Sequence, residues 1–293
     1  MISVRKVNRS FGSAQVLRDV SFAIRPGMLT GFVGGNGAGK TTTMRIILGV
    51  LALDSGSVEV DGQPITEDYR ANIGYIPEER GLYPKMKVID QLVYLGRLHG
   101  LSAREARGRG AELLERLGLG DRMGDPLEAL SLGNQQRAQI AAALVHDPVA
   151  LILDEPFSGL DPLAVETTLG VLRTAADAGA PVLFSSHQLD LVERLCDELV
   201  IIAGGEIRAN GTREDLLADA AEPVWELQSS ADVGWVRGAG VQVREFDAGN
   251  VRFVARTEDE ANRVLAEALA RGTVTHFGRV NRTLHDIFQE TVR

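Results

Sequence analysis

Four residues near the N-terminal end of the chain have the types and the spacing that bind a nucleoside triphosphate. Gly34, Gly39, Lys40 and Thr41 occupy the fixed positions of the pattern G-x-x-x-x-G-K-[ST]. Glycines let backbone N–H groups approach phosphates closely, because side chains would collide with them. A lysine can reach the β- and γ-phosphates, and a threonine hydroxyl can ligate Mg²⁺. The alternative is a glycine-rich turn without a ligand, and the motifs further along the chain argue against it.

The segments around this loop predict that it joins a strand to a helix. Residues 28–33 form a short apolar run, and residues 42–48 begin a stretch with helical apolar spacing. The N-terminus of a helix presents free N–H groups to an anion. We therefore expect ATP to be bound by Asn36, Gly37, Ala38, Gly39, Lys40, Thr41 and Thr42.

A second feature is an apolar run that ends in two acids. Residues 150–153 are apolar and precede Asp154 and Glu155, as expected for a buried parallel strand whose end meets a ligand. Asp154 is placed to hold Mg²⁺ together with Thr41, and Glu155 to orient and polarise an attacking water. The alternative is that the acids only cap the turn that Pro156 predicts.

With these motifs, the sequence resembles the ATP-binding subunit of ATP-binding-cassette (ABC) transporters over about residues 1–215. The resemblance implies an α/β P-loop NTPase core with an antiparallel β subdomain and a helical subdomain at about residues 85–140. Residues 130–134 resemble the signature sequence, with Leu132 and Asn134 departing from the usual pattern. In the family this segment faces the ATP of the opposite subunit. The resemblance assigns this trans contact to Ser131, Gly133, Asn134 and Gln135.

Four further positions carry roles by resemblance alone. Phe11 stands where an aromatic stacks on adenine, although a core phenylalanine is the alternative. Glu78 replaces the usual glutamine of the coupling loop; it accepts hydrogen bonds but does not donate them when ionised, and it could still approach Mg²⁺ or its water. Asp161 matches the D-loop that links the two active sites. His187 matches the switch histidine at the γ-phosphate. The other histidines are interpreted as ordinary surface or core residues: His99, His146, His276 and His285.

Composition limits the classes of protein that the chain can belong to. It has 293 residues, a formal net charge of −9 and one cysteine, Cys196. The charge gives no electrostatic footprint for general nucleic-acid binding, and one cysteine excludes an intrachain disulfide. No stretch approaches the roughly 18–20 apolar residues of a membrane span, and the N-terminus lacks a signal peptide. We therefore expect a cytoplasmic protein.

The pattern along the chain predicts an ABC-type domain at 1–220 and a small α+β domain at 221–293. Short alternating stretches within 1–30 and 55–76 predict antiparallel strands. Helices are expected at 88–95, 111–118 and 189–196, and core strands at 151–153, 182–184 and 198–202. In the C-terminal domain, strands are expected at 224–227, 241–243, 251–254 and 273–275. Helices are expected there at 258–271, with Ala261, Val264, Leu265 and Leu269 inward, and from 284 onward. A ferredoxin-like arrangement is one possibility.

The resemblance implies an ATPase that powers a membrane exporter of the ABC-2 type. Residues 79–84 and the C-terminal extension resemble the subgroup that serves drug, antibiotic or sodium export. Two subunits, in the simplest case identical, would sandwich ATP and Mg²⁺ at the inner face of the cell membrane, with the permease on a separate chain. The alternative is a soluble ABC-type ATPase. A regulatory module without turnover is opposed by the intact Glu155 and His187.

Overall fold

The structure is a computed structural model that describes residues 1–79, 81–212, 214–216 and 223–280. By its internal contacts the chain divides into two compact units, with the division between residues 213 and 214. The predicted boundary between residues 220 and 221 lies outside the described residues, as does the helix expected from residue 284 onward. Each unit is described by itself.

The first unit is built on a six-stranded sheet in the order β10-β9-β3-β8-β7-β6. All neighbouring strands are parallel except β10, which pairs with β9 in the antiparallel sense. The strands are β3 (Leu29–Val33), β6 (Ile73–Ile76), β7 (Ala150–Leu153), β8 (Val182–Ser186), β9 (Glu198–Ala203) and β10 (Glu206–Thr212). Every residue of β3, β7, β8 and β9 is buried, which explains their continuous apolar runs.

A four-stranded antiparallel sheet lies in the same unit, as expected from the alternating stretches. Its order is β2-β1-β4-β5, with β1 (Ile2–Phe11), β2 (Ala14–Ile24), β4 (Ser55–Val60) and β5 (Gln63–Pro64). One hydrophobic cluster joins this sheet, helix α1 (Lys40–Ile47) and the central sheet. Its fully buried members include Ile2, Met44, Phe32 and Ile202, so the loop between β3 and α1 is anchored on both sides.

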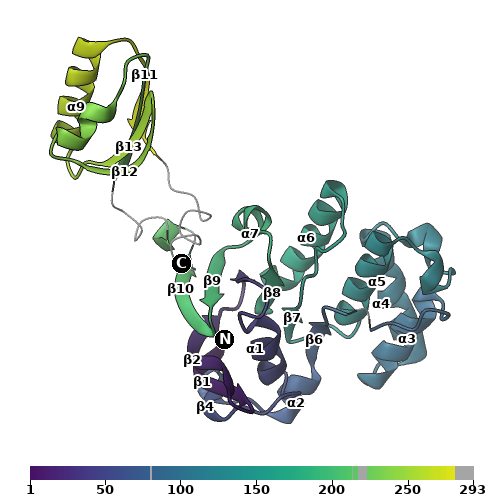
Figure 1. The fold of residues 1–293 in the computed structure, drawn as a ribbon. Helices are drawn as coiled ribbons and strands as arrows, with labels where there is room; N and C mark the ends of the chain where they lie inside the picture. Colours follow the sequence, from purple (N-terminus) through teal and green to yellow (C-terminus); the bar gives the residue numbers. More distant parts are fainter. Residues whose placement is uncertain (80, 213, 217–222, 281–293) are drawn as a thin grey trace. The chain divides into compact units, whose positions relative to one another are not determined.

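Helices α3 (Val88–Leu98), α4 (Ala103–Arg116) and α5 (Leu132–Leu144) form the helical group that was expected at about 85–140. They gather beyond β6, at the opposite edge of the central sheet from β10 (Figure 1). Helix α6 (Pro162–Asp177), which the pattern did not predict, follows β7, and α7 (Leu189–Leu195) packs on β3. The short α2 (Glu67–Ala71) precedes β6. Among the described residues, no helix is long and apolar enough to cross a membrane.

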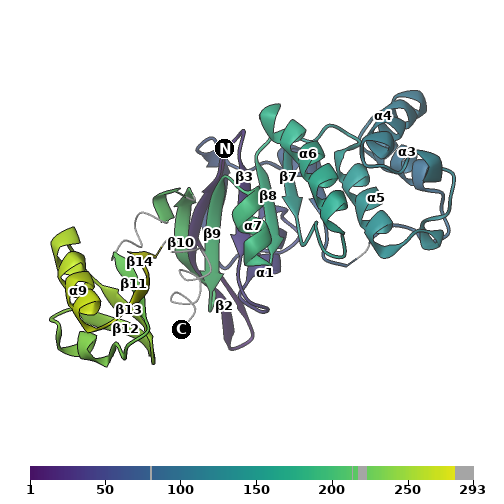
Figure 2. The ribbon, with the colours of Figure 1, turned by 90° about the horizontal axis from the view of Figure 1, so that it is seen from above.

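The second unit is a four-stranded antiparallel sheet with one long helix on its apolar face (Figure 2). Its order is β12-β13-β11-β14, with β11 (Val224–Ser229), β12 (Gln242–Asp247), β13 (Asn250–Val254), β14 (Val274–Arg279) and helix α9 (Glu258–Arg271). A short 3₁₀ helix at Gly234–Gly238 takes the place of a first helix in this ferredoxin-like order.

One packing prediction in the second unit is wrong. Ala261 and Val264 are buried as expected, but Leu269 is 59% exposed and Ala268 is buried instead. The buried stripe of α9 therefore runs through 261, 264 and 268, which is the spacing of a narrow helical face.

Candidate ATP-binding and catalytic site

The phosphate loop adopts a conformation that its glycines make possible. Gly37 and Gly39 have φ angles of 76° and 111°, in the left-handed region that side chains disfavour. A Cβ atom at Gly34 would lie 2.4 Å from the carbonyl oxygen of Ile202. The loop therefore needs glycine both for its turns and for its close approach to β9, and α1 begins directly behind it at Lys40.

The Lys40 ammonium lies inside this loop. Its Nζ donates to the carbonyl oxygens of Gly34 at 2.7 Å and Gly35 at 3.2 Å, and the residue is 9% exposed. These two bonds hold the positive charge among the loop's N–H groups, which is where a phosphate would bring its own oxygens. A charged donor held in this way binds an anion more strongly than a neutral donor does.

Thr41 and Asp154 form the oxygen-rich side of the site. The Thr41 hydroxyl donates to Asp154 Oδ2 at 2.7 Å, and the other carboxylate oxygen, Oδ1, accepts from Ser185 Oγ at 2.5 Å. Asp154 is 2% exposed. Burial raises the pKa of the nearby Tyr75 phenol, and the negative charge of Asp154 raises it further. A hydroxyl and a carboxylate beside a phosphate loop suit Mg²⁺, which prefers oxygen ligands and takes several of them from phosphates and water.

Glu155 and His187 are brought together from neighbouring strands. Glu155 follows β7 and His187 follows β8, and these strands are parallel partners. Glu155 Oε1 lies 2.9 Å from His187 Nδ1, with the carboxylate side chain 15% exposed and the imidazole 55% exposed. The parallel register therefore places an acceptor and a titratable ring at one end of the sheet, next to the loop.

The phosphate loop, Glu78, Asp154 and Glu155 enclose one cleft of about 350 Å³. It is lined by Asn36, Gly37, Ala38, Gly39, Lys40, Thr41, Thr42, Glu78, Asp154, Glu155 and also Val16 of β2. Sequence reasoning missed Val16. Its only signal was its place in an alternating strand, which does not tell which end meets the cleft.

Phe11 does not line this cleft, but it is not a core residue either. It is 48% exposed at the end of β1, and the Arg9 guanidinium carbon lies 4.8 Å from the centre of its ring. The alternative of a core phenylalanine is therefore wrong. Stacking of Phe11 on adenine stays a prediction.

The signature residues lie at the start of α5, outside the set that lines the cleft. Ser131 is the N-cap residue of α5, and its hydroxyl accepts from the Asn134 N–H at 3.3 Å. The Gln135 amide donates to the Leu130 carbonyl oxygen at 2.9 Å. A Cβ atom at Gly133 would lie 3.0 Å from the Gly159 carbonyl oxygen. The signature is thus close to the turn after Glu155 and is exposed at Ser131.

Asp161 has a local structural role in this chain. Its carboxylate accepts from the Ala164 N–H at 2.9 Å and caps the N-terminus of α6, with Pro162 at the first turn. A cap of this kind stabilises a helix by about 1 kcal/mol. The role of Asp161 in linking two active sites stays a prediction.

Two of the other four histidines pair with each other. His99 and His146 stack with ring centres 3.7 Å apart, between α3 and the end of α5. Burial, and then the neighbouring His99, lowers the pKa of His146 from 6.5 to about 4. His276 is exposed on β14, and His285 lies outside the described residues. The interpretation of the first three as core or surface residues agrees with these positions.

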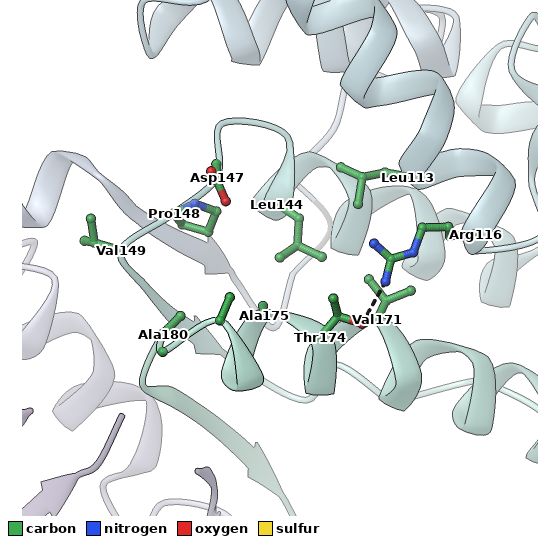
Figure 3. A pocket seen from close by; sticks show the side chains of 12 residues that line it. Leu113, Arg116, Leu144, Asp147, Pro148, Val149, Val171, Thr174, Ala175 and Ala180 are labelled. Atoms are coloured by element: carbon green, nitrogen blue, oxygen red, sulfur yellow. Dashed lines mark hydrogen bonds between the residues drawn. The ribbon is translucent and has the colours of Figure 1, made fainter. Parts of the chain in front are cut away.

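A second cavity, of about 510 Å³, lies between α4, α6 and the end of α5 (Figure 3). Aliphatic side chains such as Leu113, Leu144 and Val171 line it, and Arg116 donates to Thr174 Oγ1 at 2.8 Å on one side. Among the described residues that line it, none was predicted to bind or react. Its larger volume therefore does not make it the site, because the chemistry gathers in the smaller cleft.

Comparisons with known proteins agree with this geometry. Residues 17–158 match the family described as ABC transporter. An ABC transporter ATP-binding protein of Bacillus subtilis, YhaQ, is 38% identical over all of this chain and 98% of its own length. The chain belongs to the ATP-binding subunits of ABC transporters. It is therefore an ATPase, since ATP binding and hydrolysis define the family.

Three further comparisons cover the two units. The linearmycin resistance ATP-binding protein LnrL of Bacillus subtilis is 37% identical over 74% of this chain and 70% of its own. A solved ATP-binding subunit of an ABC transporter is similar with a TM-score of 0.69 and 32% identity, over 75% of this chain and 93% of that one. Residues 211–292 match the C-terminal domain of DrrA1-3-like ATP-binding proteins. The fold of the first unit is that of an ABC ATPase, a P-loop NTPase.

Proposed function

We propose that this ABC ATPase powers a membrane exporter of the ABC-2 type by closing and opening a dimer around ATP. The observation that carries the proposal is the 2.9 Å contact between Glu155 and His187 beside the phosphate loop. A glutamate and a histidine at this place are what hydrolysis needs, whereas ATP binding alone does not need them. Export is supported by relatives named for resistance and for Nod factor export.

In this proposal each side chain of the cleft has one task. Lys40 and the loop N–H groups would hold the β- and γ-phosphates, and Thr41, Asp154 and Glu78 would hold the cation. Mg²⁺, when bound there, offsets phosphate charge and fixes the γ-phosphate for in-line attack. Glu155 would take the proton that the attacking water loses, and His187 would hold the γ-phosphate geometry. The water oxygen bonds to the γ-phosphorus, the bond to the bridging oxygen breaks, and ADP and phosphate leave.

We propose that the signature segment serves the ATP of a second copy of the chain. Ser131 is exposed and lies at a helix N-terminus, which favours an anion. ATP would then stabilise the closed dimer because it touches both copies. Loss of the γ-phosphate contacts on hydrolysis lets the dimer reopen.

The permease would bind the helical group at the inner face of the membrane. Tyr83, Tyr94 and Leu98 are 57%, 42% and 65% exposed, and the two tyrosine rings meet edge to face with centres 6.2 Å apart. Because Tyr94 and Leu98 are one helical turn apart on α3, they face the same way. Exposed aromatic and leucine side chains at one place are typical of an interaction surface.

The proposed catalytic role is tested with Glu155→Gln. The amide keeps the size of the side chain but does not act as a base, so turnover should fall by about 10²–10⁴-fold while ATP affinity stays within about twofold. Phosphate release and ATP binding are measured on the same preparation, and the ATP-bound variant should be dimeric in gel filtration. Rapid phosphate release by this variant would refute Glu155 as the base.

The exporter is separated from a soluble ABC-type ATPase by its partner. Wild type, isolated from its own cells with Mg-ATP, should co-purify with a multi-span membrane protein. The double variant Tyr94→Ser with Leu98→Ser should lose that protein but keep its ATPase activity, because these residues lie outside the cleft lining. An ATP-dependent dimer without any membrane partner would favour the soluble alternative.

A further inference from the structure

The backbone of Glu155 has an unusual conformation. Its φ is 52°, in the left-handed region, although the residue is not a glycine and precedes Pro156. A side chain disfavours this region, and a following proline restricts the backbone further. Such a conformation persists only where surrounding contacts impose it. The neighbours that impose it therefore also set the direction of the carboxylate.

Ser185 contacts the N–H side of Glu155. Its hydroxyl accepts from the Glu155 N–H at 2.9 Å and donates to Asp154 Oδ1 at 2.5 Å. Ser185 is completely buried on β8, two residues before His187. The Ser185 hydroxyl thus connects the Asp154 carboxylate to the backbone of Glu155, and Ser185 itself lies on the strand that precedes His187.

Gln136 contacts the carbonyl side of Glu155 together with the backbone N–H of Ser158, which donates to the Glu155 carbonyl oxygen at 3.1 Å. The Gln136 side-chain amide donates to the carbonyl oxygens of Glu155 at 3.4 Å and Pro156 at 3.1 Å, and the residue is 7% exposed. Gln136 lies on α5, directly after Gln135, the last of the signature residues. The same helix therefore begins at the segment proposed to meet a second ATP and holds the backbone of Glu155 in its own subunit.

We propose that Ser185 and Gln136 are positioning residues that impose the left-handed backbone of Glu155 and thereby aim its carboxylate at the attacking water. This inference rests on the proposed role of Glu155 as the base. Neither Ser185 nor Gln136 is among the residues that line the cleft; both act through Glu155. Because Gln136 lies on the signature helix, the direction of the Glu155 carboxylate depends on the position of that helix. Closure of the signature on one ATP therefore changes the position of the base at the other ATP.

The first test compares matched substitutions. Gln136→Met keeps the shape of the side chain without the amide, and we expect kcat to fall about tenfold with ATP affinity within about twofold. Ser185→Ala should lower kcat at least as much, because it also frees Asp154, and should raise the Mg²⁺ concentration needed for half-maximal turnover.

The controls lose similar groups elsewhere. Gln139→Met changes a 5% exposed glutamine on the same helix, one turn further on. Thr30→Val removes a buried hydroxyl on β3 for which the described residues provide no hydrogen-bond partner. Both should keep wild-type kcat. Unchanged kcat in Gln136→Met would overturn the inference, and so would a loss in Gln136→Met that Gln139→Met matches.

A second test asks whether the effect passes through Glu155. The slow residual turnover of Glu155→Gln is measured in a single-turnover reaction, with and without Gln136→Met. If Gln136 acts by aiming the base, the tenfold effect should shrink to less than about twofold in this background. An undiminished tenfold loss would show a general structural role and overturn the inference. Wild-type turnover by Glu155→Gln itself would instead refute the proposed base, which is a different failure.

Discussion

The two parts of the site differ in how far one chain completes them. On the phosphate side, Lys40 and Asp154 are 9% and 2% exposed and already bonded within the chain. On the signature side, Leu132 is 59% exposed, and Ser131 is exposed and bonds only to its own helix among the contacts described. Folding alone therefore preorganises the phosphate side. The signature residues do not line the cleft of the same chain.

The largest effect is expected from a substitution on the phosphate side. Lys40→Ala removes a charged donor from inside the loop, so ATP affinity should fall about 10–100-fold, given about 1.5–3 kcal/mol for hydrogen bonds to charged groups. Affinity is measured with a fluorescent ATP analogue on the isolated chain. Lys85→Ala, at an exposed lysine outside the cleft lining, is the control and should bind as wild type. Equal affinity of both variants would contradict a preorganised phosphate side.

The next effect separates folding from association on the signature side. Because Leu132 is exposed, Leu132→Ala should change the free energy of unfolding by less than about 0.5 kcal/mol. If Leu132 is buried in the ATP-dependent dimer, Leu132→Ala should weaken that dimer about tenfold. Ile140→Ala, at a fully buried site on the same helix, should instead cost about 2–5 kcal/mol of unfolding free energy. Denaturant titration and sedimentation distinguish the two, and a dimer unaffected by Leu132→Ala would argue against the signature as an interface.

The smallest effect concerns the far end of the signature helix. Burial and His99 lower the pKa of His146 in the folded chain to about 4. As the pH falls, His146 is therefore protonated in the unfolded chain before it is protonated in the folded chain. The free energy of unfolding should therefore drop between pH 6.5 and about 4, and this contribution should level off below pH 4. Since the ring is partly exposed, the loss should be on the order of 1 kcal/mol.

His146→Phe keeps the stacking on His99 without the titrating nitrogen. Its melting temperature should fall less than that of wild type between pH 6.5 and 4. Parallel pH profiles of the two proteins would show that His146 does not titrate in this way.

Spacing along the chain predicted the residues at strand ends well. The apolar runs before Asp154 and His187 are β7 and β8, and these strands bring Glu155 to His187. Helix α9 covers the predicted range 258–271. Leu269 was misplaced because a window of apolar spacing does not tell how wide a face the sheet covers.

Contacts between distant segments could not be read from spacing. Ser185 and Gln136 meet the backbone of Glu155 from two other elements, and only the register of β7 on β8 and the packing of α5 bring them there. The left-handed φ of Glu155 also has no sequence signal, because the residue is not a glycine. Helix α6 was missed, although Asp161 and Pro162 have the types of an N-cap and first turn.

The central claim is that each ATP site combines the phosphate side of one copy with the signature of another. It is tested most directly by mixing two inactive variants, Lys40→Ala and Ser131→Arg. In a mixed dimer one site has both defects and the other has none, so ATPase activity should return to about a quarter of wild type when half of the dimers are mixed. If each chain used its own signature, every site would carry one defect, and the mixture would stay as inactive as its components.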